Sequence, residues 1–118
     1  MKNNNLLSKH CVPCEGNQKP LSHVENVEYL HDLNTWNLID DNAIEKKLIF
    51  KDFKKALNFV NIVGDLAESE GHHPDIEIYN WNRVRVKLST HAIQGLSEND
   101  FIMASKIDDL YKKQTSDT

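Results

Sequence analysis

Three histidines stand close together between Glu68 and His91, and histidine is the side chain that can both donate and accept a proton near neutral pH. His72 and His73 are adjacent, a proline follows them, and His91 comes after a segment in which apolar and polar residues alternate. Such a group is compatible with general acid–base catalysis, with a metal site, or with histidines in a purely structural role.

The metal interpretation is disfavoured by the spacing of these residues. Three histidines and a water molecule are typical of catalytic zinc. However, neighbours in an extended segment point to opposite faces, so His72 and His73 are poorly placed to bind one ion together. The H-E-x-x-H pattern, which places two histidines on one helical face, is absent.

Acid–base catalysis is the better functional hypothesis, because His72 and His91 follow the predicted ends of a helix and a strand, where site residues often lie. Glu68 precedes His72 by one helical turn and is placed to orient a histidine or to stabilise its charged form. Asp100 is predicted to lie in the first turn of a helix, a position that favours a carboxylate whether or not it serves the site. The residues alone leave a structural role open for all three histidines. That role is the one we expect for the three others, His10, His23 and His31.

The two cysteines, Cys11 and Cys14, form one C-x-x-C pair. One pair supplies half of a tetrahedral zinc site, and no second cysteine pair completes it, so His10 and His23 are the candidates for the other two positions. Pro13 and Gly16 predict a loop here, whereas a redox pair would be expected at the start of a helix. We therefore expect two reduced thiols in a flexible segment.

Length and composition favour one soluble globular domain. The chain has 118 residues, of which 39% are hydrophobic and 27% charged, with a formal net charge of −4. The acidic balance argues against nucleic-acid binding. No apolar run approaches the ~20 residues that a membrane span needs, and the first residues do not resemble a secretory signal. The expected location is the cytoplasm.

Hydrophobic periodicity predicts three helices and four strands in the order α-β-β-α-β-β-α. Ser22 and Glu25 form the S-x-x-E pattern of a capping box, and Gly71 is placed to end the longest helix. The predicted fold class is α+β, with a four-stranded, mostly antiparallel sheet and three helices packed on one face. The helices are expected over residues 22–30, 53–70 and 97–113, and the strands over 36–39, 44–50, 76–79 and 83–89. Residues 1–20 are predicted to be a flexible extension, 21–113 a single catalytic domain, and 114–118 a frayed tail.

A longer pattern connects these residues. Glu68-x-x-x-His72-His73-Pro74, then Trp81, His91 and Asp100, resembles the signature of the pterin-4a-carbinolamine dehydratases. The resemblance extends to Trp36-Asn37, to Phe50-Lys51-Asp52-Phe53 and to Leu88-Ser89-Thr90-His91, and covers residues 21–112. The chain departs from relatives at Gly71, Trp81 and Asn99, and none of these changes removes a signature histidine.

The resemblance implies a hydro-lyase that dehydrates 4a-hydroxytetrahydropterin, the 4a-carbinolamine, to quinonoid dihydropterin and water. It implies acid–base roles for His72 and His91, and a capping or site-supporting role for Asp100. No metal and no cofactor are implied. The implied substrate-binding residues are His73, Glu68, Trp36 and Pro74.

The same resemblance implies that the reaction recycles the pterin of an aromatic amino acid hydroxylase. It also implies a homodimer or homotetramer. The alternative is a non-catalytic assembly or interaction protein on the same scaffold, in which loss of the histidines would be expected.

Overall fold

The structure, a computed structural model, describes residues 5–13, 18–33 and 35–116. It confirms the predicted α+β class and the predicted order of the helices and strands. The helices are α1 (His23–Leu30), α2 (Phe53–Glu70) and α3 (Glu98–Ser116), with short 3-10 turns η1 (Leu6–Ser8) and η2 (His91–Ile93). The strands are β1 (Asn37–Ile39), β2 (Ala43–Ile49), β3 (Asp75–Tyr79) and β4 (Arg83–Leu88).

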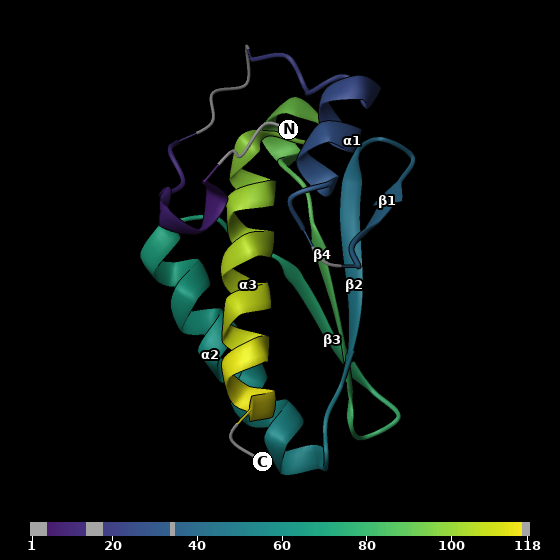
Figure 1. Cartoon of the computed structure of the whole chain (residues 1–118), viewed down its shortest axis with the longest axis vertical. Coiled ribbons are helices and arrows are strands. Elements are labelled where there is room, and N and C mark those ends of the chain that lie inside the picture. The colour runs from purple at the N-terminus through teal and green to yellow at the C-terminus, as the bar shows by residue number, and fades with distance from the viewer. Residues whose placement is uncertain (1–4, 14–17, 34, 117–118) are drawn as a thin grey trace.

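The four strands form one sheet in the order β1-β2-β4-β3, and every neighbouring pair is antiparallel. Two tight turns build the two hairpins. Asp40 and Asp41 in the first, and Asn80 and Trp81 in the second, adopt positive φ angles, as the turns of tight hairpins require. Figure 1 shows α2 and α3 side by side across one face of the sheet, with α1 near the β1–β2 end.

Alternation along β4 explains which face of the sheet the helices cover. Val84, Val86 and Leu88 are fully buried, and they join the same core cluster as Phe59 of α2 and Phe101 of α3. The charged residues between them point to the opposite face, because successive side chains in a strand alternate. The sheet therefore holds α2 and α3 in place by burying their apolar faces.

Helix ends follow the predicted capping chemistry. Ser22 and Glu25 form a complete capping box at the start of α1. Gly71 ends α2 with φ 66°, a left-handed conformation that glycine adopts readily. The sharp end of α2 brings the chain directly to His72.

Residues near both ends of the described chain make contacts that were not predicted. Residues 5–13, which we call the N-terminal strap, contain a 3-10 turn with a buried Leu6, and the Nζ of Lys106 donates to the carbonyl of Leu7 at 2.9 Å. Helix α3 continues to Ser116, three residues beyond the predicted end. Local polarity predicted little structure at these ends, but side chains of α3 supply the strap with partners. Residues 14–17, including Cys14, lie outside the described residues.

Within the described ranges, no helix is both long enough and apolar enough to cross a membrane.

Candidate active site

The imidazole of His72 is bound by a buried carboxylate of helix α3. Its Nε2 lies 2.7 Å from Oδ1 of Asp100, in the first turn of α3. The side chain of Asp100 is fully buried, and that of His72 is 12% exposed. An ionised carboxylate can only accept hydrogen bonds, so Nε2 of His72 carries the proton in this pair. The other ring nitrogen, Nδ1, then carries no proton and can accept a hydrogen bond.

The second oxygen of Asp100 binds two further groups. Oδ2 accepts a hydrogen bond from the Thr90 hydroxyl at 2.8 Å and another from the backbone N–H of Ser97 at 3.0 Å. The contact with Ser97 is the half of a capping box in which the third helical residue reaches back to the N-cap. The start of a helix also favours a negative charge. One carboxylate thus both begins α3 and orients His72.

His91 belongs to a segment tied to the same carboxylate. Thr90 pairs with Gly95 through backbone hydrogen bonds of 2.8 and 3.4 Å, which closes the loop containing η2. Gly95 is required here, because an added Cβ would lie 2.4 Å from a side-chain atom of Pro20. His91 opens η2 with an exposed side chain and borders a hollow of about 230 Å³.

His73 faces a different partner from that of its neighbour. Its Nε2 lies 2.5 Å from Oε2 of Glu68, and the two side chains are 60% and 78% exposed. Both residues, together with Pro74, line a hollow of about 400 Å³ beside α2. His72 and His73 therefore bind carboxylates on different elements, as expected for neighbours in an extended segment.

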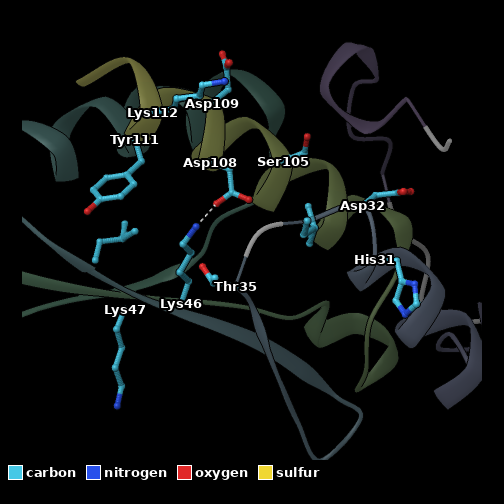
Figure 2. A pocket seen from close by; sticks show the side chains of 12 residues that line it. His31, Asp32, Thr35, Lys46, Lys47, Ser105, Asp108, Asp109, Tyr111 and Lys112 are labelled. Carbon is cyan, nitrogen blue, oxygen red and sulfur yellow. Dashed lines mark hydrogen bonds and ion pairs between the residues drawn. The ribbon is translucent and has the colours of Figure 1, made fainter. Parts of the chain in front are cut away.

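Trp36 binds a different carboxylate of α3. Its indole N–H donates to Oδ1 of Asp108 at 2.9 Å, and the Nζ of Lys46 lies 2.7 Å from the same oxygen. Figure 2 shows the Lys46–Asp108 pair in a cavity of about 660 Å³ between β2 and the later turns of α3. Asp108 lies eight positions beyond Asp100, or ~12 Å along the helix axis. The described contacts therefore bring Glu68, His72, His73 and Asp100 together in two pairs, and do not bring Trp36 to them.

The strap packs beside the His72–Asp100 pair. Oε1 of Glu70, at the end of α2, accepts the Cys11 N–H at 2.7 Å, and Oε2 lies 2.8 Å from Nδ1 of His10. The side chain of Asn99 exchanges two hydrogen bonds with the backbone of Val12. Burial, with the nearby charges of Glu70 and Asp100, raises the pKa of the Cys11 thiol to about 12.

Several residues that build this site were not predicted to be site residues. Thr90, Glu70 and Asn99 are common polar residues with no diagnostic spacing, and their partners lie far along the chain. The predicted place of Asp100 in the first turn of a helix was the one local signal. Among the described residues, no group of three or more histidine, cysteine, aspartate or glutamate side chains is arranged to hold a metal ion.

His72 is partly buried and is bound by the buried carboxylate of Asp100. His91 follows Thr90, which binds the same carboxylate. Such an arrangement is typical of enzymes that transfer protons. Comparison with known proteins identifies the family. The family model described as "Pterin 4 alpha carbinolamine dehydratase" matches residues 19–110. The chain belongs to this family of lyases.

Curated relatives are similar in sequence to this chain along most of its length. A protein of Alkaliphilus metalliredigens, named a putative pterin-4-alpha-carbinolamine dehydratase, is 46% identical over 106 residues, which are 89% of this chain and 95% of the relative. A mitochondrial pterin-4-alpha-carbinolamine dehydratase of Arabidopsis thaliana is 41% identical over 109 residues, covering 89% of this chain and 58% of the relative.

Two solved structures share the fold. A Brucella melitensis protein titled "transcriptional coactivator/pterin dehydratase" is similar with a TM-score of 0.73 and 35% identity, over 79% of this chain and 99% of that one. A pterin dehydratase-like protein, described as a RuBisCO assembly factor, is similar with a TM-score of 0.56 and 20% identity, over 66% of this chain and 90% of that one. At that identity the second likeness shows the fold alone.

Proposed function

We propose that this chain dehydrates 4a-hydroxytetrahydropterin to quinonoid dihydropterin and water, with histidines as the general acid and base. The observation that carries the proposal is the pairing of His72 with the buried Asp100 at 2.7 Å. A fixed partner on Nε2 leaves Nδ1 of a defined tautomer for the substrate. Such an imidazole is suited to proton transfer near neutral pH.

The reaction needs two coordinated proton movements. The hydroxyl on C4a leaves as water after it receives a proton. The C4a–O bond breaks as the adjacent ring nitrogen gives up its proton and forms a double bond to C4a. One charged histidine serves as the acid and one neutral histidine as the base, and each transfer contributes roughly 10²–10⁴-fold to the rate.

His72 and His91 are the two residues proposed for these roles. His91 is exposed at a hollow, and its neighbour Thr90 binds the same carboxylate as His72. His73, Glu68 and Pro74 are proposed to contact the substrate, which is supported by their shared hollow. Trp36 is not included, because its indole N–H is directed at Asp108.

The proposal includes the biological setting implied by the family. The substrate would be supplied by an aromatic amino acid hydroxylase, whose pterin cofactor leaves that enzyme as the carbinolamine. The working form would be a cytoplasmic homodimer or homotetramer.

The direct test follows breakdown of the carbinolamine by ultraviolet absorbance with the purified 118-residue chain, with and without a metal chelator. Acceleration over the spontaneous rate that survives the chelator is the expected result. Acceleration that disappears with the chelator would favour a metal-dependent enzyme instead. No acceleration would favour an assembly or interaction protein. A preparation of the double variant His72→Gln/His91→Gln serves as the matched control for contaminating activity.

A further inference from the structure

Thr90 joins the end of β4 to the start of α3 through its side chain. It is 4% exposed, and its Oγ1 lies 2.8 Å from Oδ2 of Asp100 and 2.8 Å from the hydroxyl of Ser97. We infer that Thr90 is a positioning residue for the reaction, which holds the carboxylate of Asp100 so that His72 presents Nδ1 to the substrate. The inference rests on the function proposed above.

The directions of the hydrogen bonds follow from the groups present. The ionised carboxylate of Asp100 accepts, so the single hydroxyl proton of Thr90 is donated to Oδ2. Oγ1 of Thr90 is then left as an acceptor, and the hydroxyl of Ser97 donates to it. The result is a directed chain from the Ser97 hydroxyl through Thr90 to Asp100, whose other oxygen receives Nε2–H of His72.

This hydrogen-bonded chain restricts the orientation of the Asp100 carboxylate. Without Thr90, the donor left to Oδ2 among the described contacts would be the backbone N–H of Ser97 at 3.0 Å, and rotation about the last bond of the Asp100 side chain would be less restrained. The second donor to Oδ2, Thr90, comes from the segment after β4 and, together with His72 and Ser97, fixes the carboxylate plane. A buried carboxylate is also costly unless its oxygens are hydrogen-bonded.

Thr90 also couples the two histidines that we propose to carry protons. It directly precedes His91, and its backbone closes the loop that contains η2. A change that displaces Thr90 therefore acts on Asp100, the partner of His72, and also on the start of the segment that contains His91. A displacement near 1 Å of a catalytic group can cost ~10²-fold in rate.

Two substitutions separate this role from a structural one. Thr90→Val keeps the shape and removes the hydroxyl, whereas Thr90→Ser keeps the hydroxyl and removes a methyl group. We expect Thr90→Val to lower kcat at least about tenfold with little change in KM, and Thr90→Ser to keep kcat within about twofold of the parent chain. Ser97→Ala removes the more distant donor, so a smaller loss is expected.

The spectroscopic readout is the ¹⁵N chemical shift of the His72 imidazole in the full chain. The parent chain and Thr90→Ser should show the tautomer protonated on Nε2, and Thr90→Val should show a mixture of tautomers. If Thr90→Val does not fold, the other two variants still test the hydrogen-bonded chain from Ser97 to Asp100. Ser97→Ala should reduce kcat, and Thr90→Ser should not.

Two results would overturn the inference: an unchanged kcat and tautomer in folded Thr90→Val, or equal losses in Thr90→Val and Thr90→Ser. Absence of activity in the parent chain would overturn the proposed function rather than this inference. In that case the tautomer of His72 still decides whether Thr90 orients it.

Discussion

The Nε2 of His72 and the Oδ1 of Asp100 lie 2.7 Å apart, although the two residues are separated by 28 positions in the chain. The contact joins the end of α2 to the first turn of α3. It buries a carboxylate completely while leaving part of the imidazole exposed. This single relationship sets which ring nitrogen of His72 is available and therefore underlies the predictions for activity.

Asp100→Asn is expected to reduce kcat by ~10²-fold or more, because it disturbs the carboxylate that orients His72, the proposed general acid or base. An amide has one acceptor oxygen, so it cannot accept from His72 and from Thr90 and Ser97 at once. Steady-state kinetics and thermal unfolding check this. Asp109→Asn, on the same helix in an i,i+4 pair with Lys113, is the matched control and should stay near the parent rate. A folded Asp100→Asn variant with more than half of the parent kcat would contradict the assignment.

The substrate hydroxyl can lie on either face of the pterin ring, and we hypothesise that His72 and His91 each serve one epimer. His72→Gln and His91→Gln should then impair opposite epimers, each by roughly 10²–10⁴-fold. Rates measured separately with each epimer provide the test. Equal loss of both epimers in both variants would rule out this division of labour.

The strap should detach in acid. Burial by itself would raise the pKa of Glu70, but the N–H of Cys11, His10 and the ammonium of Lys106 outweigh it and hold that pKa below its usual 4.5. In Glu98, which binds Lys9, burial is likewise outweighed and the pKa is lowered. A lowered pKa in the folded state means that the stabilisation is present above about pH 4.5 and is lost as the pH falls through the folded-state pKa.

Hydrogen exchange of the Cys11 and Val12 amides, measured by NMR between pH 6 and pH 3 and corrected for the intrinsic rate, checks this release. Protection should fall below about pH 4.5 in the parent chain. Glu70→Gln should show lower protection at pH 6 and a weaker dependence on pH. Protection that is the same at both ends of the range would show that these carboxylates do not hold the strap.

The thiol of Cys11 should react slowly with alkylating reagents. Burial and the neighbouring negative charges raise its pKa from 9.0 to about 12, so little reactive thiolate is present at pH 8. In a Cys14→Ser background, iodoacetamide labelling of the native chain should be at least about tenfold slower than labelling in urea. Equal rates would mean that the packing of the strap against Glu70 and α3 does not shield the Cys11 thiol.

Trp36→Phe is expected to affect stability more than substrate binding. The change removes the indole N–H that donates to Asp108, and a lost hydrogen bond to a charged group costs about 2 kcal/mol. The melting temperature should fall while KM for the carbinolamine stays near the parent value. A raised KM without loss of stability would restore the substrate contact implied by the family signature.

Much of the fold was predictable because its signals are local. The alternation of Val84, Val86 and Leu88 predicted a half-buried strand, and all three side chains are buried. The capping box at Ser22 and the left-handed Gly71 marked helix ends correctly. Local reasoning failed at the strap, because a polar segment interrupted by proline gives no indication that Glu70, Asn99 and Lys106 will bind its backbone.

The sequence by itself determined the order of the elements, the family, and the candidate residues His72, His73, His91 and Asp100, because hydrophobic period, capping and motif spacing are properties of neighbouring residues. Tertiary structure alone decided the partners: Asp100 for His72, Glu68 for His73, and Asp108 for Trp36. Sequence spacing does not specify which of many carboxylates comes within 3 Å of an imidazole. That choice depends on how α2, α3 and the sheet pack, which the whole core sets at once.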